Sequence, residues 1–408
     1  MNGQPIGSLN RFDPTTRGGS SLRYLSSLGV AVAALLAFAA VPTRAQEPVK
    51  VGLITTLSGS TGYAGQDIRD GMQLAIDSSG ANIQLISQDD GMKPGQAKQI
   101  ADRFVKTDNI KILTGIIFGN IAAAVVPDLM EAGAIYISPN TGASRFAGKE
   151  CNKSFFVASF QNDSQGEAAG ALARSLGYKK AFLIAPNYAG AKEAIAAFKS
   201  YFKGDTAGEI YTRLDQTDFA VEIAAIRDAN PDVVHVFEPG GLGIAFLRQY
   251  HQAGMTSRVP MVAHVATMDN TIVKSVGEIA EGIYTASHWN DDFDNDANKK
   301  FIAAWKAKYG DRTVTAYASL GYDTGLLIAS AVKAVGGKLD DMDAVRAALR
   351  KADFASVRGA FKFGPNQHPI QDWYALKAVK RPNGEYALKT EGKVLTDHSD
   401  RYAAECKL

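Results

Sequence analysis

From residue 49 onward, the chain alternates short apolar runs with amphipathic stretches, and small polar turns separate them. Residues 49–57 form an apolar run typical of a buried strand, and Ile68, Met72 and Ile76 after it fall on one face of a helix. Further strands are expected around Ile83 and over residues 112–118, 134–138, 181–185, 209–211, 233–237 and 260–263. This alternation predicts the α/β class, with parallel sheets covered by helices on both faces.

The strand and helix pattern starts twice along the chain. Helices are expected between the strands, for example from Pro94, over 121–131, from Phe219 to Ile226, and over 242–252. After Tyr284 the pattern changes, with helices expected over 297–309, 315–335 and 342–351 and strands over 360–363 and 373–379. No linker is long enough to separate independent domains. We therefore expect two similar α/β lobes, with a chain that crosses between them several times.

The first 45 residues have the order of a secretory signal peptide. Arg11, Arg17 and Arg23 precede an apolar run over 30–41, and Thr43 and Ala45 place small residues at positions −3 and −1 of a cut. The alternative is a transmembrane anchor, but this run is well short of the ~20 residues that a bilayer needs. We therefore expect cleavage after Ala45 and a soluble mature protein in the periplasm.

The charge balance excludes one class of function. The chain has 44 Lys and Arg against 42 Asp and Glu, and the predicted signal peptide holds several of the arginines. The rest of the chain is therefore close to neutral. A nucleic-acid-binding protein would carry a basic field to meet phosphate charge, so we expect no nucleic-acid partner.

Two cysteines, Cys151 and Cys406, remain to be explained. In an exported protein they lie in an oxidising compartment, where thiols tend to pair, so we favour a disulfide between them. The alternative is two unpaired thiols. A metal site is not indicated, because two cysteines this far apart match no zinc-ligand spacing.

Three turns that follow strands in the first unit are small and polar, over residues 58–62, 119–120 and 138–142. Ligands of open parallel sheets bind beyond the carboxyl ends of the strands. Each turn also leads to a helix N-terminus, where free N–H groups and the helix dipole favour an anion. The alternative is that these Ser, Asn and Thr residues only cap helices. Hydroxyls and backbone donors without a fixed cation favour a carboxylate over a polyphosphate.

The second unit offers different side chains in the corresponding turns. Tyr188, Glu238 and His264 follow its strands, and His288 falls where this unit gives way to the later helices. Tyr188 and Tyr63 can stack on a flat ligand or donate a hydroxyl, and each histidine can bind a ligand oxygen. The alternative is that both histidines are structural.

The sequence contains no recognisable catalytic or metal-binding motif. Residues 59–62 lack the Gly-Lys-Ser/Thr ending of a phosphate loop, and the six histidines form no zinc pattern. Asp292, Asp294 and Asp296 alternate as in a calcium loop, but Ala297 replaces its glycine, so they favour the start of a helix instead. We expect no enzymatic activity, no cofactor and no metal.

Three segments carry a family resemblance: LSGSTGYAGQDIRDGMQLAID (57–77), YISPNTGASRFAGKECNKSFF (136–156) and TAYASLGYDTGLLIASAVKAVGG (315–337). Together they resemble the branched-chain amino-acid-type (type I) periplasmic binding proteins of ABC transporters, over essentially the whole mature chain. The resemblance implies two Rossmann-like lobes, 46–159 plus 288–362 and 160–287 plus 363–408, after a signal peptide over 1–45. It also implies three hinge crossings, near Ser159, Ser287 and Lys362, with both cysteines near the hinge side.

The resemblance further implies ligand contacts at the positions that match those of the family. These are Ser58, Tyr63 and Ala64 in the first turn, Asn120, and Ser138, Pro139, Asn140, Thr141 and Gly142 in the first lobe, and Tyr188 in the second. One departure concerns the turn after residues 260–263. Amino-acid-binding members usually have an acid there facing the ligand ammonium, and this chain has none before Asp269.

A buried ammonium without a counter-charge is costly, and Glu238 is the alternative acid. We therefore favour a carboxylate whose far end is polar or aromatic, and an aromatic acid fits Tyr63, Tyr188 and the two histidines. The resulting hypothesis is a monomeric solute-binding protein of an ABC importer that closes by hinge bending on a small carboxylate, amino-acid-like or preferably aromatic, and docks on a membrane permease. The alternatives are the ligand-binding component of a sensory or chemotaxis system and a secreted α/β hydrolase.

Overall fold

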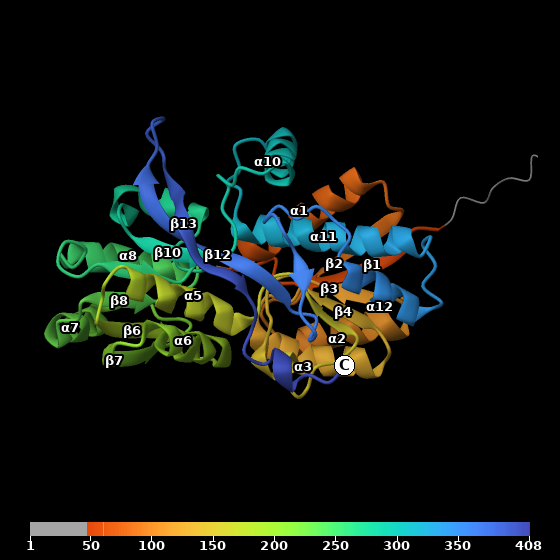
Figure 1. The fold of residues 1–408 in the computed structure, drawn as a ribbon, viewed down its shortest axis with the longest axis horizontal. Helices are drawn as coiled ribbons and strands as arrows, with labels where there is room; N and C mark the ends of the chain where they lie inside the picture. Colours follow the sequence, from red (N-terminus) through yellow and green to blue (C-terminus); the bar gives the residue numbers. More distant parts are fainter. Residues whose placement is uncertain (1–46, 60) are drawn as a thin grey trace, which may run out of the picture. The chain divides into compact units, whose positions relative to one another are not determined.

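The computed structural model of the protein describes residues 47–59 and 61–408. The predicted signal peptide and its cleavage after Ala45 lie outside these residues. No helix in this part of the chain has both the length and the apolar character needed to cross a membrane. The described chain forms two α/β lobes, each built on its own sheet (Figure 1).

The first sheet consists of five parallel strands in the order β2-β1-β3-β4-β5. Its strands are β1 (Val49–Thr55), β2 (Ile83–Asp89), β3 (Ile112–Thr114), β4 (Ile135–Ser138) and β5 (Phe155–Val157). In β1, Val51 and Leu53 belong to one apolar cluster, whereas Ile54 belongs to the cluster on the opposite face. Helices therefore cover both faces of this sheet, as the continuous apolar run predicts.

The helices of the first lobe come from two distant parts of the chain. They are α1 (Gly62–Ser79), α2 (Pro94–Lys106), α3 (Gly119–Glu131), α4 (Ser144–Ala147), α10 (Asp296–Tyr309), α11 (Ala316–Ala334) and α12 (Met342–Lys351). Figure 1 shows α1 and α11 side by side. A Cβ atom at Gly71 would lie 2.1 Å from the carbonyl oxygen of Ala318, and one at Gly321 would lie 2.1 Å from that of Ile68. Glycine at both positions lets the two helix backbones come this close.

The second sheet is mixed and has the order β11-β12-β10-β9-β8-β6-β7, with β13 paired to β12. Its strands are β6 (Lys180–Pro186), β7 (Asp205–Thr212), β8 (Val233–Val236), β9 (Met261–Ala263), β10 (Tyr284–Ser287), β11 (Lys362–Phe363), β12 (Pro369–Lys380) and β13 (Tyr386–His398). The strands from β6 to β10 are parallel, and β12 joins β10 antiparallel. An antiparallel hairpin thus completes an otherwise parallel sheet.

Helices cover both faces of the second sheet as well. They are α5 (Asn162–Ser175), α6 (Ala189–Phe202), α7 (Ala220–Ala229), α8 (Gly241–Gln252) and α9 (Asn270–Val276), with 3₁₀ turns at Gly277–Ala280 and Ala403–Glu405. Leu183 of β6 packs in the cluster that includes α5 and α6, and its neighbour Ile184 packs in the cluster that includes α7 and α8. Successive side chains of this central strand therefore pack against the helices on opposite faces of the sheet.

The chain passes between the two sheets three times within the described residues. It leaves the first sheet after β5, returns after β10 to form α10, α11 and α12, and enters the second sheet again at β11 and β12. This arrangement, two α/β lobes joined by three crossings, is the one that the family resemblance implies. The predicted boundaries near Ser159, Ser287 and Lys362, and the residue ranges of the lobes, remain predictions.

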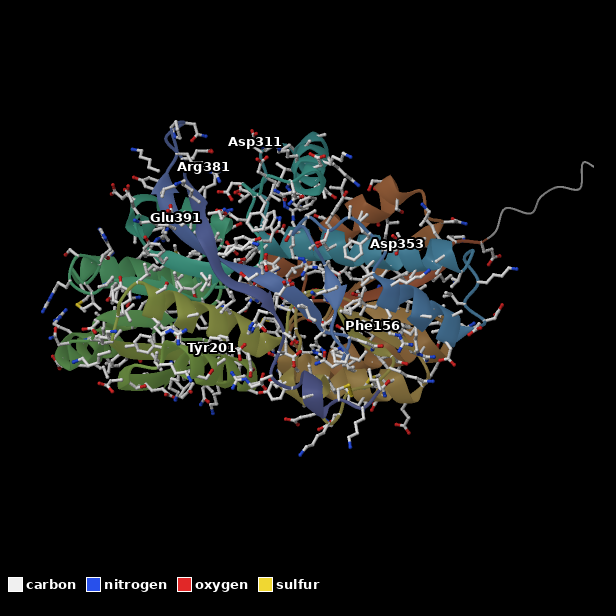
Figure 2. All side chains as sticks on the ribbon, viewed as in Figure 1. Phe156, Tyr201, Asp311, Asp353, Arg381 and Glu391 are labelled. Atoms are coloured by element: carbon white, nitrogen blue, oxygen red, sulfur yellow. A yellow bond between two sulfur atoms is a disulfide. The ribbon has the colours of Figure 1, made fainter. Side chains whose placement is uncertain are left out.

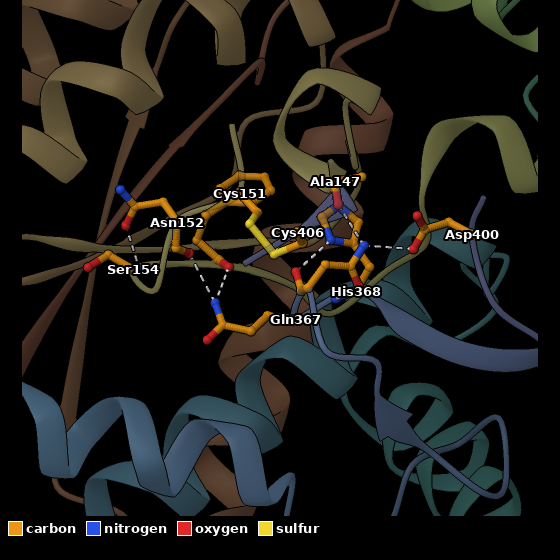
Figure 3. The surroundings of a disulfide bond; sticks show 10 residues. Ala147, Cys151, Asn152, Ser154, Gln367, His368, Asp400 and Cys406 are labelled. Atoms are coloured by element: carbon orange, nitrogen blue, oxygen red, sulfur yellow. Dashed lines mark hydrogen bonds between the residues drawn. A yellow bond between two sulfur atoms is a disulfide. The ribbon is translucent and has the colours of Figure 1, made fainter. Parts of the chain in front are cut away.

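The two cysteines form a disulfide between Cys151 and Cys406, whose Cα atoms lie 5.6 Å apart. This bond joins the C-terminal segment to the first lobe, where Tyr402 and Glu405 lie next to Gly148. Around the bond, the amide of Gln367 donates to the carbonyl oxygens of Asn152 and Phe155, at 3.1 and 2.6 Å (Figure 3). The expected disulfide is thus present, and hydrogen bonds from Gln367, in the turn before β12, reach the same part of the first lobe as Cys151.

Several predicted elements differ from the structure in length. The strand expected over 112–118 ends at Thr114, because Gly115 turns out of the sheet with φ 111°. The strand expected over 360–363 is confined to Lys362–Phe363. Of the aspartates proposed to favour the start of a helix, Asp296 is the first residue of α10, whereas Asp292 and Asp294 precede it. The side chain that caps the helix is that of Asn295, which accepts from the N–H of Asn298 at 2.8 Å.

Strand β13 and helix α5 are among the elements that the sequence did not predict, whereas the strand expected over 373–379 lies within β12. The β12–β13 hairpin carries many charged side chains, among them Arg381 and Glu391 (Figure 2). An apolar strand residue such as Phe156 is instead buried inside the first lobe (Figure 2). Since β13 is partly exposed and polar, it lacks the apolar alternation that indicates a strand. Helix α5 was missed because glycine, serine and alanine fill it. Gly166 packs so closely against α6 that an added Cβ would lie 2.2 Å from the carbonyl oxygen of Ala194.

Candidate functional site

A cavity of about 90 Å³ lies where the turns after the strands of both sheets meet. A cavity of this volume has room for several water molecules or one small organic molecule. The lining residues are Ile117, Phe118, Gly119, Asn140, Thr141, Phe160, Asn162, Gln165, Tyr188, Gly190, Ala194, Phe237, Pro239, His264, Val265, Ala266, Asp269, His288, Ala316, Tyr317 and Leu320. The carboxyl ends of parallel strands thus supply most of this site, as expected for an open α/β sheet.

One end of the cavity is the N-terminus of α3. Phe118 precedes this helix and provides no side-chain cap, and the first helical hydrogen bond runs from the N–H of Ala122 to the carbonyl of Phe118. In the described part of the chain, the N–H groups of Gly119, Asn120 and Ile121 therefore have no acceptor. Such a helix end attracts a negative charge through its free donors and its dipole.

Thr141 adds a hydroxyl to this end of the cavity. A Cβ atom at Gly119 would lie 3.6 Å from Thr141 Oγ1, so the hydroxyl stands beside the start of α3. The Thr141 hydroxyl is buried and has no hydrogen-bond partner among the described residues. Leaving a buried hydroxyl unpaired costs free energy, and a ligand acceptor would remove that cost.

The turn that carries Thr141 is braced from within. The Ser138 hydroxyl donates to the carbonyl oxygen of Thr141 at 2.6 Å, and the side-chain amide of Asn140 donates to the carbonyl oxygen of Ile117 at 2.9 Å. The N–H of Gly142 donates to Asn162 Oδ1 at 3.0 Å, which ties this turn to the start of α5. The turn is therefore held in place before any ligand arrives.

Aromatic rings form most of the remaining wall. Tyr188 meets Phe237 edge to face, with 6.2 Å between ring centroids, and His264 stacks on Phe237 at 3.8 Å. Phe160 lies against His288 at 5.4 Å. Flat rings on several sides favour a flat apolar body in the ligand.

Both histidines are neutral hydrogen-bonding groups. Burial lowers the pKa of His264 and of His288 well below the ordinary value. His264 Nδ1 accepts from the N–H of Ala266 at 3.1 Å, which leaves the ring proton on Nε2 as a donor. Neither ring nitrogen of His288 has a partner among the described residues. The cavity lining in this part of the chain contains no lysine or arginine, so uncharged donors must hold any anion.

Asp269 is the single carboxylate among the described lining residues. It caps α9 by accepting from the N–H of Ile272 at 2.9 Å, and its other oxygen accepts from the Tyr63 hydroxyl at 2.8 Å. Burial raises the pKa of Asp269 to about 6. The turn over residues 264–268 contains no acid, but Asp269, directly after it, lies on the cavity wall. Asp269 is the N-cap of α9, and because no helix was predicted there, the signal of an acid before a helix was missed.

Glu238 stands between the lining residues Phe237 and Pro239 but does not itself line the cavity. Its Oε1 accepts from the Thr212 hydroxyl at 2.7 Å, and its Oε2 has no partner among the described residues. Burial raises the pKa of Glu238 to about 8, so its carboxyl is mostly protonated at pH 7. This acid therefore provides little negative charge for a ligand ammonium.

The cavity brings together only part of the predicted set. Asn140, Thr141, Tyr188, His264 and His288 line it, and Tyr63 reaches it through Asp269. The predicted contacts outside the lining are Ser58, Ala64, Asn120, Ser138, Pro139, Gly142 and Glu238. Their contacts with a ligand remain predictions. Phe160, Phe237 and Tyr317 were not expected, because no local pattern marks an aromatic residue of a turn or a helix start as part of a site.

The chain is similar to known proteins both in sequence and in fold. The sequence model of a family described as periplasmic binding protein matches residues 48–384. The Leu/Ile/Val-binding protein homolog 6 of Brucella melitensis is 26% identical over 377 residues, which cover 88% of this chain and 95% of that protein.

Two solved structures have the same fold at a higher identity. One is an ABC-transporter solute-binding protein from R. palustris in complex with benzoate, at 29% identity and a TM-score of 0.82, covering 88% of this chain and 100% of that one. The other is an ABC-transporter solute-binding protein from Rhodopseudomonas palustris BisB5 in complex with 3,4-dihydroxybenzoic acid, at 28% identity and a TM-score of 0.79. This match covers 87% of this chain and 99% of the other.

Proposed function

Because the chain belongs to the periplasmic binding protein family and is a substrate-binding protein of an ABC transporter, we propose that it captures a small aromatic carboxylate between its two lobes. It is a binding protein and not an enzyme. It binds a small molecule and delivers it to a membrane permease. The proposal concerns the ligand, its contacts and the way in which the site closes.

The chemistry of the cavity carries the proposal. At one end, the free N–H groups of α3 and the unpaired hydroxyl of Thr141 can bind a ligand carboxylate, although no basic side chain of the described residues lines the cavity. Beyond this end, Phe160, Tyr188 and Phe237 surround the space with rings. A flat ring that carries one carboxylate meets both requirements at once. The two solved relatives, which bind benzoate and 3,4-dihydroxybenzoic acid, support this choice.

Closure of the lobes follows from the same arrangement. The turns after β3 and β4 hold the anionic end from the first lobe, and the turns after β6, β8 and β9 supply rings and His264 from the second. A ligand that contacts both lobes favours the closed form over the open one. We infer that a monomer closes in this way in the periplasm and then docks on the permease.

The first test is isothermal titration of the purified protein with benzoate, 3,4-dihydroxybenzoate and leucine. We expect an aromatic acid to bind more tightly than leucine. Native mass spectrometry of protein that was never unfolded provides an independent check, since it identifies any retained small molecule. Tighter binding of leucine, or a retained aliphatic amino acid, would contradict the proposal.

Substitution of Thr141 tests the anionic end. Thr141→Val keeps the shape of the side chain and removes the hydroxyl, and a hydrogen bond to a charged group contributes about 1.5–3 kcal/mol. The affinity for the aromatic acid should therefore fall by roughly 10- to 100-fold. The matched control is Thr206→Val on the exposed edge strand β7, which should leave the affinity unchanged. Equal affinities for the two variants would place the carboxylate elsewhere.

A further inference from the structure

Tyr63 and Asp269 form a hydrogen bond between the two lobes beside the cavity. Tyr63 lies in the first turn of α1, and Asp269 precedes α9. The Tyr63 hydroxyl donates to Asp269 Oδ2 at 2.8 Å, while Asp269 Oδ1 accepts from the N–H of Ile272 at 2.9 Å. Both carboxylate oxygens therefore already have donors from the protein. The rings of Tyr63 and of the lining residue Tyr317 also meet edge to face, with 5.9 Å between their centroids.

Without the hydrogen bond from Tyr63, Asp269 would be well placed to bind a cationic group of a ligand. It lines the cavity, only 2% of its surface is exposed, and no other acid is found among the described lining residues. An ionised carboxylate in such a place stabilises an ammonium group that reaches it. The hydroxyl of Tyr63 already donates to this carboxylate. Burial and the neighbouring Asp269 raise the pKa of Tyr63 well above its ordinary value, so the phenol stays protonated.

We propose that Tyr63 determines the ligand specificity of the cleft by giving Asp269 the hydrogen bond that the ammonium of an α-amino acid would otherwise give. This inference rests on the proposed function and deepens it. The hydrogen bond from Tyr63 to Asp269 connects the two lobes in the way that the ammonium of a bound amino acid would connect them through Asp269. A carboxylate without an amino group can then close the cleft. An α-ammonium that enters must share the carboxylate of Asp269 with the phenol and the N–H of Ile272, or displace the phenol and leave its buried hydroxyl without an acceptor, and either weakens its binding.

The test compares ligands that differ only in the amino group. The pairs are phenylacetate with phenylglycine, 3-phenylpropionate with phenylalanine, and 4-methylpentanoate with leucine, each measured by isothermal titration alongside benzoate. The wild-type protein should bind the acid without an amino group at least about tenfold more tightly than its partner. In Tyr63→Phe this ratio should fall by about tenfold, because Asp269 loses its donor and becomes available to the ammonium.

Two further variants make the result specific. Asp269→Asn in the Tyr63→Phe background should restore the wild-type ratio, because an amide does not attract an ammonium as a carboxylate does. The matched control is Tyr211→Phe, which removes a hydroxyl that donates to Glu209 at 2.7 Å on the surface of the second lobe and should leave the ratio unchanged. Should Tyr63→Phe fail to fold, Asp269→Asn alone decides: it should leave the ratio at its wild-type value, and a further loss of amino-acid binding would show that Asp269 already serves the ammonium and would overturn the inference.

The outcomes separate this inference from the proposed function. If wild type binds the acids and Tyr63→Phe leaves the ratio unchanged, the inference is wrong and the proposed function stands. The inference is also wrong if wild type binds an amino acid as tightly as the matching acid. Binding of benzoate but of no member of any pair would show that cavity size, not Tyr63, sets the ligand, and would overturn the inference too. If wild type binds none of these carboxylates, both proposals fail.

Discussion

Substitution of Arg358 should strongly destabilise the fold, because its side chain donates hydrogen bonds to two of the segments that pass between the lobes. Its Nη2 and Nη1 donate to the carbonyl oxygens of Ala158 and Ser159, at 2.6 and 2.8 Å, just after β5. Nη1 also donates to Gln371 Oε1 in β12 at 2.8 Å, and Nε donates to Asp323 at 2.9 Å. The side chains of Arg358 and Asp323 are 3% and 0% exposed.

Arg358→Leu should lower the free energy of unfolding by about 3–5 kcal/mol. Removing one partner of a buried ion pair leaves the other charge in a site without water, and losses of this size are typical. Here the change also leaves the carbonyl oxygens of Ala158 and Ser159 without this donor. The measurement is urea denaturation at pH 7, followed by circular dichroism and tryptophan fluorescence.

Arg213→Leu provides a matched control for this change. Arg213 pairs with Asp215 at 3.1 Å, but their side chains are 78% and 83% exposed, and such surface pairs contribute about 0–1 kcal/mol. Its loss should therefore barely move the transition. If Arg358→Leu costs no more than this control, the role given to Arg358 at the lobe junction is wrong.

The remaining predictions concern the ring wall and a buried acid. Tyr188→Ala should weaken binding of the aromatic acid by at least about tenfold, since it removes a ring from the cavity wall, while circular dichroism shows an intact fold; unchanged affinity in the titration would count against this wall. Glu238 has a pKa raised from 4.5 to about 8, so between these values the folded protein keeps a proton that the unfolded chain has lost. The free energy of unfolding should therefore fall as pH rises through this window, by at most about 5 kcal/mol, and Glu238→Gln should remove most of that fall. Urea denaturation at pH 5 and pH 9 would show it, and an equal fall in both proteins would refute the assignment.

Much of the fold could be predicted because its central strands are apolar on both faces. The runs at 49–57 and 233–237 correspond to β1 and β8, where alternating residues face two helical layers. The same reasoning fails for β13, which lies partly exposed in a hairpin and keeps polar side chains along much of its length. Helix α5 was also not predicted, because close packing against α6 requires small residues rather than a stripe of large apolar ones.

The site was predictable to the extent that strand ends determine it. Thr141, Tyr188 and His264 follow strands and do line the cavity, as the rule for open sheets implies. Tyr317 could not be found in this way, because it starts a helix far along the chain and reaches the site only through the packing of α11 on α1. The bond between Tyr63 and Asp269 depends on the approach of two lobes, which no local pattern encodes.

A crystal structure of the protein with benzoate would test the central claim most directly. The account predicts one benzoate in the cavity, with its carboxylate at the N–H groups of α3 and the Thr141 hydroxyl and its ring among Phe160, Tyr188 and Phe237. A ligand bound outside this cavity, or a carboxylate turned towards the second lobe with no contact to α3, would contradict it.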